Sequence, residues 1–164
     1  ILASIALLSL GPAQKAARDT KRIGDLRGMQ SLLQIYYTKC GHYPGDFGCG
    51  TINSSVQPTG FVPWSQDHLG ATDGSGGDLV FALSDVGVHV AANWNSSDMP
   101  HDPLPLRDYY YGVATDFSSY VLATDLETNN TVLKSDVDGL VFYLSCDDHP
   151  EGATEGFYGY CVQF

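Results

Sequence analysis

The sequence predicts an α+β fold, with one long N-terminal helix packed on a C-terminal antiparallel β-sheet of three to four strands. Three observations carry this prediction: helical periodicity within residues 1–38, strand-like segments within residues 109–164, and two local pairs of cysteines. A helix followed by a run of strands is the order typical of α+β domains. The chain of 164 residues shows no internal repeat and is long enough for one hydrophobic core.

The predicted helix has two parts of different character. Residues 1–10 are an apolar run without a charge, so this part needs lipid or other apolar helices around it. Further along, apolar side chains recur at spacings of three and four, which gives the helix one face that can pack on a sheet. This face consists of Ile23, Leu26, Met29, Leu33 and Tyr36.

The length of this helix predicts a division of the chain into an arm and a head. A helix over residues 1–38 would span about 57 Å at about 1.5 Å per residue, which exceeds what a domain of this size can cover. We expect residues 1–22 to form a projecting apolar and basic arm, and residues 23–164 to form a globular head that includes the rest of the helix. Within the arm, Pro12 lacks a backbone donor and should weaken the helix.

Charge is distributed unevenly along the chain. The formal net charge is −11 at pH 7, yet five of the eight basic residues lie between positions 15 and 27. The acidic head is unsuited to nucleic-acid binding, which needs clustered Lys and Arg. The basic segment has two interpretations: a solvated helix face, or a surface that pairs with the acidic heads of neighbouring copies.

The four cysteines form two pairs that are close in sequence, Cys40 with Cys49 and Cys146 with Cys161. Neither pair has the C-x-x-C spacing of zinc or redox motifs, so we expect structural disulfides and an oxidising compartment. By loop entropy, each disulfide would contribute roughly 2.5–3 kcal/mol. The pattern therefore indicates an exported protein.

The middle of the chain carries weaker signals. The helix should end near Gly41, because His42, Tyr43 and Pro44 follow. Up to about residue 77 we expect an irregular connection, and residues 78–90 are compatible with a short helix followed by an extended piece.

Strand signals come late and in order. Residues 109–113 and 120–126 predict a hairpin around a turn at 116–119, because aromatic and β-branched residues flank a short polar segment. Two further strands are expected at residues 140–144 and 157–164.

Several segments resemble the bacterial type IV pilin and type II secretion pseudopilin superfamily. The segment ILASIALLSLGPAQKAARDTKRIGDLRGMQSLLQIYY is similar to the latter part of the conserved pilin helix. The segments DPLPLRDYYYGVATDFSSYVLATDLE and LKSDVDG resemble pilin sheet regions. Mature pilins begin with an N-methylated aromatic residue and carry a glutamate in the apolar run. The sequence has neither, so the resemblance implies that it begins part-way through that helix, with the start of the mature helix missing.

The resemblance implies a structural role. It predicts a major pilin that polymerises through its N-terminal helix into a type IV pilus-like extracellular filament, used for adhesion, twitching motility or DNA uptake. The implied partners are copies of the chain itself, the inner membrane before assembly, and the pilus assembly machinery with its minor pilins. The residues that we expect to take part in filament assembly are Ile1, Leu2, Ile5, Leu7, Leu8, Leu10, Pro12, Arg18 and Arg22.

Two other functions stay open at this point. One is a pseudopilin that forms the periplasmic piston of a type II secretion system. The other is a membrane-anchored surface-binding domain that does not polymerise. The C-terminal loop between Cys146 and Cys161 resembles the pilin D-region and favours the pilus.

No arrangement of residues predicts catalysis, and we expect neither an enzyme nor a bound cofactor, because the histidines lack metal-ligand spacing and no nucleophile has a recognisable base beside it. Asp136 and Asp138 precede Gly139 as in the start of a calcium loop, although the same pattern occurs in ordinary turns. Three sequons are candidates for glycosylation, at Asn53, Asn95 and Asn129.

Overall fold

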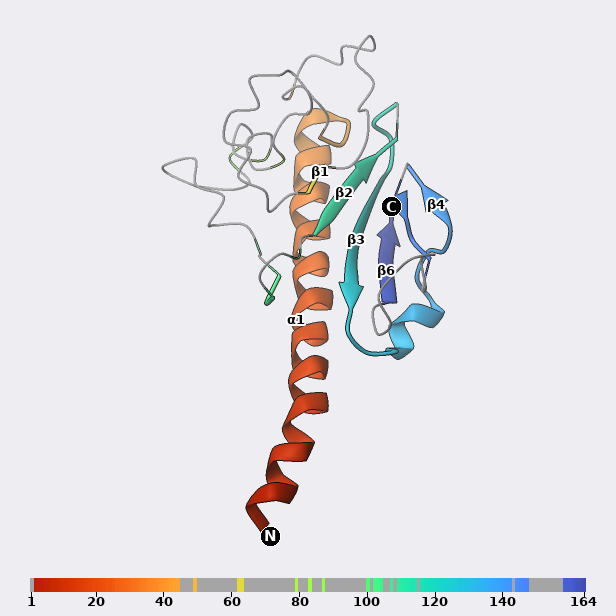
Figure 1. Ribbon diagram of the computed structural model, residues 1–164. Helices are drawn as coiled ribbons and strands as arrows, with labels where there is room; N and C mark the ends of the chain where they lie inside the picture. The colour runs from red at the N-terminus through yellow and green to blue at the C-terminus, as the bar shows by residue number, and fades with distance from the viewer. Residues whose placement is uncertain are drawn as a thin grey trace.

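In the computed structural model, one long helix lies against a small antiparallel sheet (Figure 1). The residues that the structure describes are 2–44, 49, 62–63, 79, 83, 87, 100, 102–104, 107, 109–114, 116–142, 144–147 and 158–164. The helix is α1 (Leu2–Cys40). The strands and the short 3-10 helix are β1 (Val62–Pro63), β2 (Tyr110–Val113), β3 (Tyr120–Leu126), η2 (Thr131–Lys134), β4 (Leu140–Val141), β5 (Leu144–Ser145) and β6 (Tyr158–Gln163).

The main sheet has four antiparallel strands in the order β1-β2-β3-β6. Its centre is β3, which pairs with β2 on one side and with β6 on the other. The C-terminal half of α1 runs beside this sheet, and the N-terminal end of α1 extends past the sheet (Figure 1). The α+β class is therefore confirmed.

The predicted apolar face of α1 forms the centre of the core. Leu26, Met29, Leu33 and Tyr36 have no exposed surface, and Ile23 is 9% exposed. They pack with alternate residues of β3, Tyr120, Leu122 and Leu126, in one continuous hydrophobic cluster. The intervening residues of β3 point away from α1, as alternation along a strand requires.

The helix ends where the sequence predicts. Gly41 has a φ of +77°, which favours glycine, and its N–H donates to the carbonyl of Tyr37 at 2.7 Å. Tyr43 then donates its N–H to the carbonyl of Phe117 at 2.9 Å, which ties the end of α1 to the β2–β3 turn. At the other end, α1 continues through the exposed Pro12.

Both predicted disulfides are present. Cys40 bonds to Cys49 with a Cα–Cα distance of 5.0 Å, and Cys146 bonds to Cys161 with a Cα–Cα distance of 5.6 Å. The second disulfide lies in a small cluster on the face of the sheet opposite α1, together with Ala123. The predicted hairpin is also confirmed, because β2 and β3 pair from Tyr110 with Ala123 to Val113 with Tyr120.

Two strand predictions are wrong. Residues 140–144 do not form one strand of the main sheet: β4 and β5 make a separate two-stranded sheet. The chain reverses at Phe142, whose φ is +46°, and the sequence does not reveal this turn because the segment is apolar throughout. In addition, β1 lies in the stretch that was expected to be an irregular connection.

The structure describes three residues of the segment 78–90, for which a short helix and an extended piece were expected. Leu79 and Leu83 are helical and buried in the main cluster, as the predicted short helix requires, and Gly87 lies in a turn. The remaining residues of that segment lie outside the described residues.

Candidate functional site

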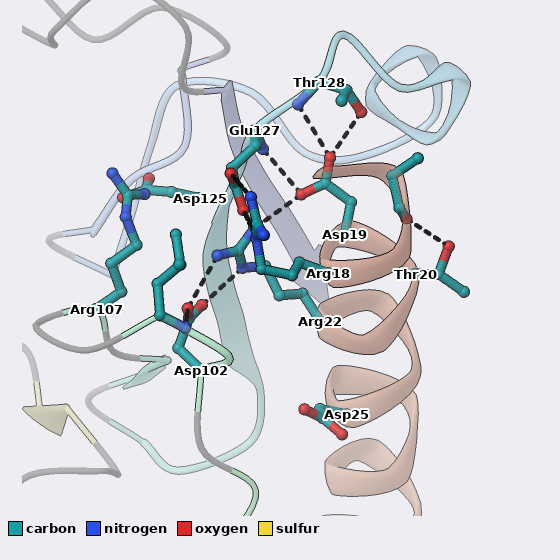
Figure 2. A network of polar contacts seen from close by, with 12 residues as sticks. Arg18, Asp19, Thr20, Arg22, Asp25, Asp102, Arg107, Asp125, Glu127 and Thr128 are labelled. Carbon is teal, nitrogen blue, oxygen red and sulfur yellow. Dashed lines mark hydrogen bonds and ion pairs between the residues drawn. The ribbon is translucent and has the colours of Figure 1, made fainter. Parts of the chain in front are cut away.

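A cluster of charged side chains joins α1 to the chain that follows β3 (Figure 2). We call this cluster the clasp. Arg18, Asp19 and Arg22 project from one side of α1 because they are three and four positions apart. Glu127 and Thr128 follow the last residue of β3, and Asp102 comes from the segment before β2. The members of the clasp are Arg18, Asp19, Arg22, Asp102, Glu127 and Thr128.

Asp19 accepts hydrogen bonds from the two residues that follow β3. Its carboxylate is fully buried and accepts the N–H of Glu127 at 2.8 Å. It also accepts the N–H and the hydroxyl of Thr128, at 2.9 and 2.6 Å. One helix side chain therefore satisfies two backbone donors that the sheet leaves unpaired as β3 ends.

Arg22 lies at the centre of the clasp and has no exposed surface. Its Nε and Nη2 donate to the two carboxylate oxygens of Asp102 at 2.6 and 2.9 Å. Its Nη1 donates to Asp19 and to Glu127, both at 2.8 Å. Burial alone would lower the pKa of Arg22, but the hydrogen bonds to Asp102 and Glu127 raise it above its ordinary value.

Glu127 is held by two guanidinium groups. Arg18 donates from Nε and Nη2 to its two oxygens at 2.7 and 2.6 Å, a bidentate pair at the edge of the buried region. The hydrogen bonds from Arg18, together with the one from Arg22, lower the pKa of Glu127 to about 2. Glu127 therefore stays ionised in any mildly acidic or neutral solution.

The chemistry of the clasp is structural. Three carboxylates face two guanidinium groups, and the remaining negative charge is met by the backbone donors on Asp19. Each carboxylate accepts several hydrogen bonds, so none is poised to take a proton from a substrate. The clasp can hold α1 against the sheet at the point where its N-terminal part begins to project.

A second polar contact lies one turn further along α1. Tyr109 donates its hydroxyl to Asp25 at 2.6 Å, and Lys21 pairs with the same carboxylate at 3.2 Å. Burial, with the hydrogen bond to Asp25, raises the pKa of Tyr109 above its ordinary value. This contact extends the polar attachment of α1 toward β2.

The interpretation of Arg18 and Arg22 needs correction. The sequence suggested a solvated face or pairing with neighbouring copies, but both guanidinium groups bind carboxylates of their own chain. The physical reason is position: Arg22 lies four residues before Leu26 and thus on the buried face of α1. Among the side chains that the structure describes, contacts of α1 with the head begin at Arg18, within the segment that was expected to project.

The other clasp residues were missed by the sequence reasoning. Asp19 and Arg22 continue the apolar stripe of α1 at the same spacing of three and four, and this signal could have identified them. The sequence carries no comparable signal for Asp102 and Glu127, which lie 80 and 105 positions from Arg22.

The remaining predicted assembly residues are apolar. Pro12 is exposed on α1. Ile1 and the side chains of Leu2, Ile5, Leu7, Leu8 and Leu10 lie outside the described residues, although the backbone of α1 is helical from Leu2. Within the part of the chain that the structure describes, no helix combines the length and the apolar character that a membrane crossing requires.

The predicted calcium and glycosylation sites are only partly described. Asp136 accepts the N–H of Cys161 at 3.1 Å, and Asp138 is exposed. Among the described residues, no group of three or more His, Cys, Asp or Glu side chains is arranged to hold a metal ion. Asn129 is exposed on the connection between β3 and η2, whereas Asn53 and Asn95 lie outside the described residues.

Comparison of the chain with protein-family models, with curated proteins and with solved structures gave no match.

Proposed function

We propose that this chain is a filament-forming structural subunit of the type IV pilin kind, which polymerises through the N-terminal part of α1. The observation that carries the proposal is the shape of α1. Its 39 residues span about 58 Å, and its N-terminal end extends beyond the sheet and the other described elements (Figure 1).

The composition of the projecting end supports assembly. Residues 2–10 contain no charged side chain, and a helix that is apolar on every side needs apolar neighbours. Copies of the same helix can supply these neighbours if the arms pack side by side in a filament core. In a membrane, the same surface would face lipid before assembly.

The clasp gives this proposal a mechanical basis. A filament that transmits force through its helices needs a firm attachment between each arm and its head. Arg18, Asp19 and Arg22 lie where α1 begins to run beside the sheet, and they connect it to both Glu127 and Asp102. Load on the arm would therefore pass into β3 through buried ion pairs as well as through the apolar core.

The two disulfides support an extracellular location, since such bonds persist in oxidising compartments. We propose that the head faces outward from the filament. The surrounding machinery and the choice among adhesion, motility and DNA uptake follow only from the resemblance to pilins.

The experiment that tests this function compares two matched substitutions on α1. Leu7→Asp places a charge in the apolar run, whereas Gln14→Asp introduces the same side chain at an exposed polar position. We expect Leu7→Asp to abolish material that pellets at high speed and appears as filaments in negative stain, and Gln14→Asp to retain it. Loss in both variants, or in neither, would contradict assembly through the apolar run.

A further inference from the structure

A cavity of about 210 Å³ lies on the face of the sheet opposite α1. Its walls come from all three long strands of the sheet and from β5. Tyr110 belongs to β2, Ala123 and Asp125 belong to β3, Gly159 belongs to β6, and Leu144 of β5 covers one side. The cavity lies beside the smaller hydrophobic cluster, which shares Ala123, Leu144 and Cys161 with its lining.

The register of the strands explains why the cavity is there. Asp125 lies directly opposite Gly159 in the β3–β6 pair, and Tyr110 lies opposite Ala123 in the β2–β3 pair. A glycine and an alanine leave little side chain over the sheet at these positions. A depression therefore remains between the carboxylate of Asp125 and the ring of Tyr110.

The cavity is formed without a ligand. A Cβ atom on Gly159 would lie 2.6 Å from the carbonyl oxygen of Asp147, so the backbone after β5 passes as close to β6 as it can. The disulfide between Cys146 and Cys161 ties the same two segments together. The covering segment is thus fixed relative to the floor of the cavity.

One described residue in the lining of the cavity, Asp125, carries a charge. Asp125 receives one long contact, from Nη1 of Arg107 to Oδ2 at 3.5 Å, and within the described residues its Oδ1 has no hydrogen-bond donor. The hydroxyl of Ser145, on the cavity wall, donates to a second carboxylate, Asp147, at 3.1 Å. Among the described residues that line the cavity, Asp125 therefore carries the only formal charge, and its contact with Arg107 is long.

The surroundings of Asp125 shift the pKa of its carboxyl group. Partial burial of its carboxylate against the cavity wall raises the pKa of Asp125, and the nearby Arg107 only partly offsets this. A cation that enters the cavity would favour the ionised carboxylate, and the ionised carboxylate would in turn favour the cation. The net charge of −11 also favours binding of a cation, because it attracts cations to the protein.

We propose that this cavity binds an alkylammonium group, with the cation at Asp125 and its hydrocarbon chain against Leu144, Ala123 and the ring of Tyr110. The source of the group is either a free primary amine or a lysine side chain of another protein, since both present the same chemistry. This assignment is independent of filament formation.

Titration of the protein with propyl-, butyl- and pentylammonium ions tests the proposal by calorimetry or by NMR shifts. We expect affinity to rise about fourfold for each added methylene, because each one leaves water for an apolar wall. Pentanol, which has the chain without the charge, should bind at least tenfold more weakly than pentylammonium. Binding of N-acetyl-lysine amide as tight as that of butylammonium would assign the site to lysine side chains; a preference for the free amines would assign it to small amines.

Two variants separate the site from a general effect of charge. Asp125→Asn should lower the affinity for butylammonium at least tenfold, while Asp116→Asn removes the same charge in the β2–β3 turn and should leave it unchanged. The side chain of Asp125 is 49% exposed, so the substitution should leave the fold intact. Absence of binding at millimolar amine, equal binding by Asp125→Asn, or tighter binding of pentanol than of pentylammonium would overturn the proposal.

Discussion

Arg22 is a cation without exposed surface, and the clasp depends on it. Removing an ion from water costs several kcal/mol, so the pair with Asp102 and the contact with Glu127 contribute little net stability compared with an apolar core. Their effect is directional, because a guanidinium group satisfies its partners only in a defined geometry. We therefore expect Arg22 to fix the position of α1 against β3.

Removal of Arg22 should be costly even though the network as a whole stabilises little. We expect Arg22→Met to lower the free energy of unfolding by about 3–5 kcal/mol, because buried carboxylates lose their partner. Urea denaturation measures this loss. The matched control is Arg27→Met on the exposed face of the same helix, where we expect a change within about 0.5 kcal/mol. Similar losses for the two variants would show that the buried network is not the cause.

The clasp also predicts how stability depends on pH. The folded-state pKa of Glu127 is about 2, below its ordinary value of 4.5. The stabilising contribution is therefore fully present above pH 4.5 and is lost as the pH falls toward 2. We expect the wild-type protein to lose stability over this window more steeply than Glu127→Gln, as measured by urea denaturation at a series of pH values. Asp138→Asn, at an exposed carboxylate, should keep the wild-type slope; parallel curves for wild type and Glu127→Gln would contradict the assignment.

At the scale of elements, α1 divides its surface between a buried stripe and an exposed one. Gly24 and Gly28 lie on the exposed side, and a Cβ atom at either would touch nothing within 4 Å. Gly159 in β6 differs, because a Cβ atom there would meet a backbone carbonyl at 2.6 Å. The same residue type thus has opposite roles in the two elements.

Alanine substitutions test this contrast. Gly24→Ala should raise the free energy of unfolding by about 0.5–1 kcal/mol, because alanine loses less backbone entropy in a helix and meets open space. Gly159→Ala should lower it, since the backbone near Asp147 has to move. Thermal denaturation of the two variants measures whether each substitution raises or lowers stability. Stabilisation by Gly159→Ala would contradict the described register.

The buried stripe of α1 makes its own prediction. We expect Leu33→Ala to destabilise the head by about 2–5 kcal/mol, because its fully buried side chain leaves a cavity in the core. Ile35→Ala on the same helix is the control, since this side chain is 47% exposed and should cost much less. Chemical denaturation compares them, and equal losses would mean that α1 does not pack on the face described.

Sequence reasoning could predict part of this architecture. The stripe from Ile23 to Tyr36 follows from periodicity, and the β2–β3 hairpin follows from two aromatic and β-branched segments around a polar turn. The reversal at Phe142 was not predictable, since it uses a positive φ in a residue that rarely adopts one. The clasp was not predictable in full, because its partners meet only once the chain has folded.

At the scale of the whole molecule, the C-terminal part of α1 packs in the core of the head, and its N-terminal end extends past the sheet (Figure 1). Figure 1 shows the N-terminal end of α1 extending past the sheet, and Figure 2 shows the clasp, which joins α1 to the chain that follows β3. In the proposed function, the apolar run from Leu2 packs with partners outside the head. The head has its cavity on the face of the sheet opposite α1. This arrangement is the basis of our proposal that the subunit assembles through its arm and presents its head outward.

The measurement that tests this account most directly is electron microscopy of the native protein, with its arm intact, in detergent-free buffer at low and moderate salt. We predict filaments at both salt concentrations, because burial of apolar surface supplies most of the free energy of assembly and is not screened by ions. Protein that remains monomeric under every ionic condition would contradict the proposed function, and a membrane-anchored surface-binding domain would then be the better description.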